Sequence, residues 1–314
     1  MRRNLEVEMG VEDTEATTLS ELKKLEYLEP PLKKNKLTPN RIANTNAIFD
    51  FPKLLNINMV ASIIIVSIRE IIMINLDMFS SFFVANWKLN GNFKFIDQFI
   101  NKLKLPEDKT KCVVICPSSI HLDYTIRKKN NFYVGAQNVS QHKEGAYTGE
   151  ISCDSLSELK IDFCIVGHSE RRQIYNETNT DVRLKSLQLI NSNIVPIICI
   201  GETLEDKENG KTNDVLVKQL LDGISDTSNS NNTIIAYEPV WAIGTGLTPS
   251  LKEIDKTHEF IKTQNSKFNN YKILYGGSVK SNNAKDIVSL SNVDGALVGG
   301  ASLKSDEFTK IIEY

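Results

Sequence analysis

Several features that often reveal a protein's function are missing from this sequence of 314 residues. No Gly-x-Gly-x-x-Gly follows a predicted strand and no Gly-x-x-x-x-Gly-Lys occurs, so both common nucleotide-binding signatures are absent. There are only four histidines, and the five cysteines form no Cys-x-x-Cys pair, which argues against a zinc site. The net charge is only −2, so the overall charge gives no reason to expect nucleic acid as a partner.

The sequence also lacks an apolar run of the length that crosses a membrane. Residues 59–68 are ten mostly apolar positions, but Arg69 and Glu70 separate them from the apolar residues 71–76. A spanning helix needs roughly 18 or more apolar residues in a row. A signal peptide would carry its apolar core near the N-terminus, where this sequence is acidic, and an Arg-rich transit sequence fits no better. We therefore expect no membrane partner.

What is present is the composition of an ordinary globular protein, with 41% apolar and 24% charged residues. The cysteines lie mostly in strand-like runs and their number is odd, so buried free thiols are expected rather than disulfides. Free thiols are typical of a reducing compartment, which favours a cytoplasmic location. The cysteines are Cys112, Cys116, Cys153, Cys164 and Cys199.

Residues 1–77 differ in character from the rest of the chain. Residues 1–30 are charged and polar, and residues 31–56 carry lysine pairs and several asparagines, which predicts a poorly ordered N-terminal extension. A second hypothesis is that the natural start is an internal methionine, with Met78 best placed, so that the extension is a start-site artefact. Both interpretations place the folded domain at residues 78–314.

From Phe82 onward, short apolar runs alternate with stretches of helical spacing. Continuous apolar runs are typical of parallel strands that are buried on both faces. The predicted strands are Phe82–Asn86, Cys112–Cys116, Phe132–Ala136, Phe163–Val166, Val195–Ile200, Ile234–Tyr237, Lys272–Tyr275 and Gly295–Val298. The predicted helices are Phe93–Leu103, Ser118–Lys129, Ser155–Leu159, Asn179–Ile190, Asp214–Ile224, Leu251–Thr263, Asn283–Leu290 and Asp306–Ile312.

Eight strand-then-helix units in about 235 residues indicate an α/β fold of the (β/α)8 TIM-barrel type. A doubly wound open sheet is the alternative, but it usually has fewer strands and no nucleotide signature supports it here. In a barrel, the chemistry gathers where strands end and helices begin. The polar residues at those points are therefore the candidates for a functional site.

The stretch after the sixth predicted strand is the most informative. Glu238 stands at the strand end, Pro239 sets the exit angle, and the loop then carries the large apolar residues Trp241 and Ile243 before Gly244. A solvated connector has no need of two such residues, whereas a lid that closes over a ligand does, and glycine lets it move. This pattern predicts a carboxylate under a mobile lid. The alternative is a buried structural glutamate followed by an ordinary turn.

Other strand ends add a cation, an imidazole and two glycine pairs. Lys88 follows the first strand and His168 the fourth, where the start of a helix would keep the imidazole neutral and able to donate a hydrogen bond. The pairs Gly276-Gly277 and Gly299-Gly300 follow the last two strands, where free backbone N–H groups suit a phosphate. The simpler alternatives are a solvated lysine, a core histidine and glycines that only make tight turns.

Two charged pairs near these strand ends carry separate predictions. Lys88 and Glu170 have opposite charges, so either could hold the other in the site. Arg171 and Glu177 are expected to form a structural pair at the base of the helix that follows the fourth strand.

A series of segments, in order along the chain, resembles those of the triosephosphate isomerase family. They are Asn86–Gly91, Gln137-Asn138, Gly145–Glu150, Val166–Arg172, Cys199–Thr203, Tyr237–Gly246, Leu274–Val279 and Val298–Leu303. Any one of them could arise by chance, but the ordered set does not. Residues 1–77 match nothing in the family.

The resemblance implies an isomerase that interconverts dihydroxyacetone phosphate and D-glyceraldehyde 3-phosphate through an enediolate, in glycolysis and gluconeogenesis, without cofactor or metal. By that resemblance, Glu238 would be the base that moves a proton between adjacent carbons, and His168 the neutral group that polarises the carbonyl. Lys88 would stabilise the developing oxyanion, with Asn86 beside it.

The resemblance also assigns the phosphate end of the site. Gly244, Ser278, Gly299 and Gly300 would offer N–H groups to the phosphate. A lid from Pro239 to about Thr248 would exclude water from the enediolate.

A homodimer follows from the same resemblance. The polar loop Gln137–Glu150 matches the family's loop that reaches into the partner subunit, which would bring Thr148 close to Asn86 and His168 of that subunit. The chain departs from the family at the far end of the lid, where Leu247-Thr248-Pro249 replaces a commoner Lys-Thr-Ala type. A proline there narrows the backbone angles that are available to the hinge.

Two other functions are compatible with parts of the pattern. A different phosphate-binding barrel enzyme, acting on a sugar phosphate or an indole-type substrate, would share the glycine pairs but would not need Lys88, His168 and Glu238 together. A catalytically silent barrel, whose extension binds a membrane or a partner, would not need these three residues at all.

Overall fold

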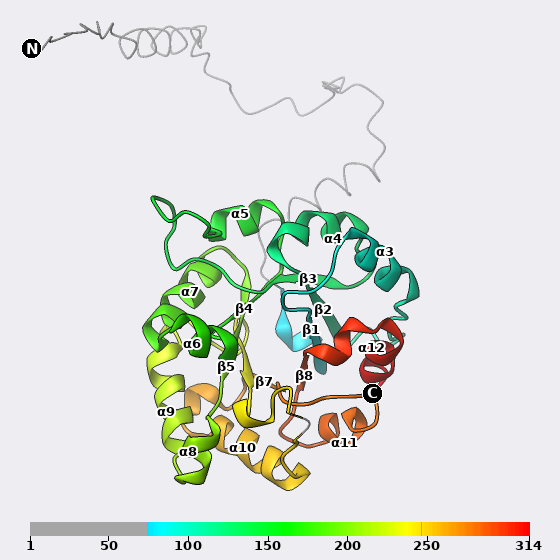
Figure 1. Ribbon diagram of the computed structural model, residues 1–314. Helices are drawn as coiled ribbons and strands as arrows, with labels where there is room; N and C mark the ends of the chain where they lie inside the picture. The colour runs from blue at the N-terminus through cyan, green and yellow to red at the C-terminus, as the bar shows by residue number, and fades with distance from the viewer. Residues whose placement is uncertain (1–73, 246) are drawn as a thin grey trace, which may run out of the picture. The chain divides into compact units, whose positions relative to one another are not determined.

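Eight parallel strands close into a barrel in the computed structural model, which describes residues 74–245 and 247–314 (Figure 1). Each strand pairs with the next, and β1 pairs with β8 to complete the circle. The strands are β1 (Ser81–Asn86), β2 (Lys111–Cys116), β3 (Tyr133–Ala136), β4 (Phe163–Val166), β5 (Val195–Ile200), β6 (Ile234–Tyr237), β7 (Lys272–Tyr275) and β8 (Gly295–Val298). The (β/α)8 prediction and all eight predicted strands are confirmed.

Helices surround the barrel on its outside, as Figure 1 shows. They are α3 (Phe93–Lys102), α4 (Leu122–Lys128), α5 (Cys153–Glu158), α6 (Ser169–Tyr175), α7 (Asn179–Asn191), α8 (Leu204–Glu208), α9 (Thr212–Gly223), α10 (Leu251–Thr263), α11 (Ala284–Val288) and α12 (Ser305–Ile312). Short 3-10 helices are η2 (Leu76–Met78), η3 (Ser119–His121), η4 (Val240–Ala242), η5 (Ser266–Phe268) and η6 (Gly300–Leu303).

The predicted helices agree with the structure except in detail. The helix predicted at residues 118–129 begins as the 3-10 helix η3 and becomes α-helical only at Leu122. The sequence pattern gave no range for α6 and missed α8, because α8 has no buried residue and α6 buries only Ser169, so neither shows an apolar face. Helix α8 is instead marked by its capping box, in which the Thr203 hydroxyl and the Asp206 carboxylate each accept from the other's backbone N–H.

The strands are buried on both faces because they separate two apolar clusters. Alternate side chains point inward and fill the barrel, for example Phe82, Val84 and Ile165. The others point outward and pack under the helices, as Phe83 and Ile115 do. This double burial explains why the strands read as unbroken apolar runs rather than as an alternating pattern.

The chain enters the barrel from the end at which the strands begin. Leu76, in η2, is fully buried and belongs to the cluster that fills the barrel interior. Phe79 packs edge-on against Phe82 and Tyr133, with ring centroids 5.5 and 5.9 Å apart. Residues 74–79 therefore contribute to the core of the barrel.

The predictions for residues 1–77 concern mainly residues 1–73, which lie outside the described part of the chain. The poorly ordered extension, the alternative start at Met78 and the domain boundary therefore stay predictions. Within residues 74–245 and 247–314, no helix combines the length and the apolar character needed to cross a lipid bilayer.

Leu76→Ala should lower the free energy of unfolding by about 2–5 kcal/mol, because removal of the buried methyl groups leaves a cavity at the base of the barrel. Met78→Ala is the matched control: Met78 is 67% exposed, so its loss should cost no more than about 0.5 kcal/mol. Denaturant unfolding of both variants checks this. Equal stability of the two would show that residues 74–77 are not part of the folded core.

Candidate active site

A cavity of about 480 Å³ lies at the carboxyl ends of the strands. Its lining includes residues that follow β1, β4, β6, β7 and β8, which are far apart in the sequence. Of the predicted site residues, it is lined by Asn86, Lys88, His168, Glu238, Gly244, Ser278, Gly299 and Gly300. The barrel therefore brings these residues together, and Thr148 is the predicted site residue that does not line this cavity.

Glu238 is fixed at the end of β6 and is only 2% exposed. Its backbone N–H donates to the carbonyl of Ile200 at 2.7 Å, which extends the pairing of β5 and β6 by one residue. The carboxylate is held from two sides: the Ser169 N–H donates to Oε2 at 2.9 Å, and Nε2 of His168 lies 3.0 Å from Oε1. A charge this deeply buried requires such partners.

Two glycines make room for Glu238. A Cβ at Gly201 would lie 1.7 Å from the carbonyl oxygen of Glu238, and one at Gly276 would lie 2.8 Å from its Cγ. Any larger residue at either position would displace the carboxylate. Gly201 and Gly276 are thus required for the site geometry, a role that the sequence pattern did not reveal.

His168 is the N-cap residue of helix α6. Its Nδ1 accepts the backbone N–H of Glu170 at 3.2 Å, in the first turn of α6. An accepting nitrogen carries no proton, so the single proton of the neutral ring belongs on Nε2, the nitrogen that faces Glu238. The imidazole therefore presents an N–H donor to the cavity.

The two groups shift each other's pKa values. Burial alone would raise the pKa of Glu238, but the facing imidazole and the Ser169 N–H lower it below its usual value. Burial alone would lower the pKa of His168, but the Glu238 carboxylate raises it above its usual value. Glu238 is therefore ionised at neutral pH.

Lys88 has a strained backbone and a fixed ammonium group. Its φ is +53°, which is uncommon for a residue other than glycine, and its backbone N–H donates to Oδ1 of Asn86 at 3.1 Å. The side chain reaches Glu170 Oε1 at 2.5 Å, so the predicted pairing of Lys88 with Glu170 is confirmed. The carbonyl of Lys88 accepts from Gln137 at 2.9 Å, a support that the sequence pattern did not reveal.

The part of the cavity that is predicted to bind phosphate is formed by glycines and a serine. Gly300 begins the four-residue helix η6, and a Cβ there would meet nothing within 4 Å, so its backbone is open to a ligand. After Gly276-Gly277 no helix begins until α11, at Ala284. Binding of an anion here would therefore depend on individual N–H groups more than on a long helix dipole. Lys280, which the sequence analysis did not select, also lines this end.

The predicted lid begins as the 3-10 helix η4. Trp241 donates its indole N–H to Oε1 of Glu202 at 2.8 Å, and the Tyr237 hydroxyl donates to the same oxygen at 3.2 Å. The Ser278 hydroxyl donates to the carbonyl of Ala242 at 2.8 Å. The lid is thus anchored to the ends of both neighbouring strands, β5 and β7.

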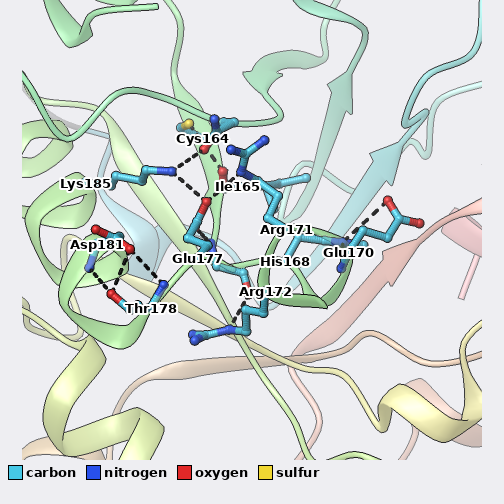
Figure 2. Close-up of polar contacts among 12 residues, drawn as sticks. Cys164, Ile165, His168, Glu170, Arg171, Arg172, Glu177, Thr178, Asp181 and Lys185 are labelled. Carbon is cyan, nitrogen blue, oxygen red and sulfur yellow. Dashed lines mark hydrogen bonds and ion pairs between the residues drawn. The ribbon is translucent and has the colours of Figure 1, made fainter. Parts of the chain in front are cut away.

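A buried ion cluster supports the turn that carries His168 (Figure 2). Figure 2 shows Arg171 and Lys185 directed at Glu177, whose Oε2 lies 2.6 Å from Arg171 Nε and 2.7 Å from Lys185 Nζ. The other carboxylate oxygen accepts the N–H of Gly167 at 3.0 Å. The predicted Arg171–Glu177 pair is confirmed, and Lys185 is a partner that the sequence analysis did not name. Gly167 has a φ of +70°, so a glycine suits this turn.

Thr148 lies on the exposed loop between β3 and α5. The neighbouring Tyr147 stacks on His142 with ring centroids 3.7 Å apart. Both rings line a second hollow of about 270 Å³, together with Arg171 and Tyr175. In the single chain, therefore, the residues of this loop do not line the main cavity.

Possible metal ligands do not gather in the described part of the chain. Within residues 74–245 and 247–314, no group of three or more His, Cys, Asp or Glu side chains could hold a metal ion. The five cysteines are all buried and free, as predicted.

The sequence was compared with protein families and with curated proteins. The model of the family described as "Triosephosphate isomerase" matches residues 81–314. A triosephosphate isomerase of Francisella tularensis subsp. mediasiatica is 44% identical over 240 residues, which cover 73% of this chain and 94% of that protein. One of Buchnera aphidicola subsp. Cinara cedri is 42% identical over 251 residues, which cover 75% of this chain and 98% of that protein.

Glu177→Gln should lower the free energy of unfolding by about 3–5 kcal/mol at pH 7, because it leaves the buried Lys185 and the half-buried Arg171 without their carboxylate. Glu158→Gln, on the exposed surface of α5, is the matched control and should have little effect. Denaturant unfolding measures both.

The loss caused by Glu177→Gln should depend on pH. Burial raises the pKa of Glu177, but Lys185 and Arg171 lower it below the usual value. Its contribution to stability is therefore complete above the unfolded pKa, about 4.3, and is lost as pH falls through the lower folded pKa. The gap between wild type and variant should close in that acid range. A gap that widens there would contradict the assignment.

Proposed function

Since the chain belongs to the triosephosphate isomerase family and interconverts dihydroxyacetone phosphate and D-glyceraldehyde 3-phosphate, we propose that Glu238, His168 and Lys88 carry this reaction. The observation that supports this most is the contact of a buried carboxylate with an imidazole, 3.0 Å apart, in the cavity at the strand ends. The reaction is a proton transfer between two adjacent carbons and therefore needs one base and one hydrogen-bond donor.

Glu238 is the base. It removes a proton from the carbon beside the carbonyl and later returns it to the neighbouring carbon. Its lowered pKa keeps it ionised at neutral pH, and its burial removes the water that would otherwise solvate it. To reach the carbon, the carboxylate must give up its contact with the Ser169 N–H.

His168 acts on the two oxygens of the substrate. Its Nε2 proton, which now faces Glu238, turns to the carbonyl oxygen of the substrate and stabilises the charge that develops there. When the carboxylate moves to the carbon, the contact that raises the pKa of His168 is lost. Burial and the Glu170 N–H then both favour the neutral ring. A neutral imidazole can donate and recover a proton between the two oxygens.

Lys88 supplies the positive charge. Lys88 lines the cavity; Glu170 fixes its ammonium, and the Asn86 side chain accepts from its backbone N–H. It stabilises the enediolate oxygen and helps to hold the anionic substrate. The strained backbone at Lys88 is consistent with a position that is set by the reaction rather than by local preference.

The phosphate lies beside Lys88, because a Cβ at Gly299 would be only 3.9 Å from the Lys88 ammonium. The backbone N–H groups of Gly244, Ser278, Gly299 and Gly300 are its proposed ligands, and all four residues line the cavity. A phosphate there places the reacting carbons toward Glu238 and His168. Closure of the lid then excludes water and keeps the enediolate from losing its phosphate.

We infer a homodimer in which Thr148 completes the partner's site. Apolar side chains near the loop support this: Leu89, next to Lys88, is 96% exposed, and Tyr147 and Tyr175 line the small hollow at the base of the loop. Such residues are normally covered in an assembly. We also propose a cytoplasmic location, which the five free buried cysteines support.

Glu238→Asp should reduce kcat by roughly 100-fold or more, because the shorter side chain moves the base away from the carbon by about an ångström. Glu208→Asp, on the exposed end of α8, is the control for the same chemical change and should leave kcat unaltered. A coupled assay of glyceraldehyde 3-phosphate conversion measures both. Unchanged turnover in Glu238→Asp would exclude Glu238 as the base.

Leu89→Asp should convert the dimer into single chains of 35.3 kDa and reduce turnover, because an interface cannot bury an unpaired carboxylate at low cost. Leu221→Asp, at a 56% exposed position on α9, makes the same change away from the loop and should leave a dimer. Analytical ultracentrifugation distinguishes the two states. Sedimentation of the unmodified protein as a single chain would refute the dimer.

A further inference from the structure

The short helix α8 contacts the lid at Trp241, outside the cavity. The Trp241 indole N–H donates to Glu202, which precedes α8, and the ammonium of Lys207 lies 3.5 Å from the centroid of the indole ring. A cation over a tryptophan face is attracted by the ring electrons. Trp241 is therefore held at its edge by a carboxylate and at its face by a cation.

Lys207 also reaches the other end of the lid. Its Nζ lies 3.7 Å from Oε1 of Glu253, in the first turn of α10. The second oxygen of that carboxylate accepts from both the N–H and the hydroxyl of Ser250, the residue that follows Pro249. Lys207 thus contacts Trp241, in the first half of the lid, directly. It reaches Ser250, the residue after the far hinge, through the carboxylate of Glu253.

The lid is open in this structure. Gly244 is exposed, and a Cβ there would meet nothing within 4 Å, so the space beside this residue is empty. Glu238 is drawn back onto the Ser169 N–H. A lid that covered a phosphate would bury Gly244, so the contacts of Trp241 with α8 belong to the open form.

The lid is built to move as a unit. Trp241 lies inside the 3-10 helix η4, and its carbonyl accepts from the Thr245 hydroxyl at 3.1 Å. That hydroxyl in turn accepts the N–H of Leu247 at 3.2 Å. Movement of the tip toward Ser278 and the Gly299-Gly300 turn therefore carries Trp241 with it and away from Lys207.

We propose that Lys207 is a positioning residue that holds the lid open through Trp241 and Glu253, and so sets the balance between substrate capture and product release. Lys207 does not line the cavity and contacts no reacting group. The charge of Lys207 attracts the Trp241 ring only while the lid is open. Removing it therefore favours the closed form, which binds the phosphate more tightly.

The size of the effect follows from the strength of the contact. An exposed or half-buried cation–π contact changes an equilibrium by about two- to fivefold. The dissociation constant for inorganic phosphate and the KM for glyceraldehyde 3-phosphate should therefore fall by about that factor in Lys207→Met. The kcat should not rise, because a lid that opens less readily does not release product faster.

Three variants separate the effect of the Lys207 charge from the effect of its apolar stem. Lys207→Met removes the charge and keeps most of the apolar stem, whereas Lys207→Arg keeps the charge and should restore wild-type values. Lys218→Met, on the exposed face of α9, removes the same charge far from the lid and controls for net charge. Tighter phosphate binding and a lower KM in Lys207→Met alone would support the proposal.

A spectroscopic signal reports on the lid itself. The chain has two tryptophans, and Trp87 is fully buried, so protein labelled with 5-fluorotryptophan gives one resonance from the core and one from the lid. In Lys207→Met without ligand, the Trp241 resonance should move toward its position at saturating phosphate. In Lys207→Arg and Lys218→Met it should stay at the wild-type position.

The proposal is overturned if Lys207→Met matches Lys218→Met in KM and in the Trp241 resonance, or if its KM rises. It is equally overturned if Lys207→Arg behaves like Lys207→Met, since charge would then not be the cause. If wild-type protein binds no phosphate while KM still falls in Lys207→Met, the proposal stands and the phosphate assignment of the glycines fails instead.

Discussion

The burial of one carboxylate is the constraint on which the rest of the site depends. Glu238 is 2% exposed, and an ionised carboxylate at such a place is stable only if other groups supply what water would have supplied. The Ser169 N–H and His168 do so, and both stand at the start of α6. Glu238, His168 and the helix that begins beside His168 therefore form one arrangement, in which each part needs the others.

That arrangement is fixed by the residues around it. The Glu177 cluster holds the turn before His168, and Gly201 and Gly276 leave the space in which Glu238 lies. On the lid side, Glu202 accepts hydrogen bonds from both Tyr237 and Trp241. Residues other than the proposed reacting groups thus determine where Glu238 and His168 stand. This is the usual division of work in a catalytic site, where supporting residues fix the geometry of the reacting ones.

Much of the fold followed from local pattern because a barrel of parallel strands repeats one unit. Each strand is an apolar run bounded by polar residues, so the eight strand ranges could be predicted to within a residue. Helices α6 and α8 could not, since neither buries an apolar side chain that would mark its inner face. Similarly, the pairing of Lys88 with Glu170 could be suspected from charge, whereas the contact of Gln137 with the Lys88 carbonyl joins residues 49 apart in the chain and left no local signal.

The sequence by itself determined which residues stand at the strand ends, because strand limits and residue types are local properties. It therefore identified Lys88, His168 and Glu238 as the candidate reacting groups. Only the tertiary structure decided how these groups face one another: which imidazole nitrogen holds the proton, how Glu238 stays ionised although buried, and which lysine contacts the lid. Those properties depend on distances between segments that are remote in the chain, and such distances exist only once the barrel has closed.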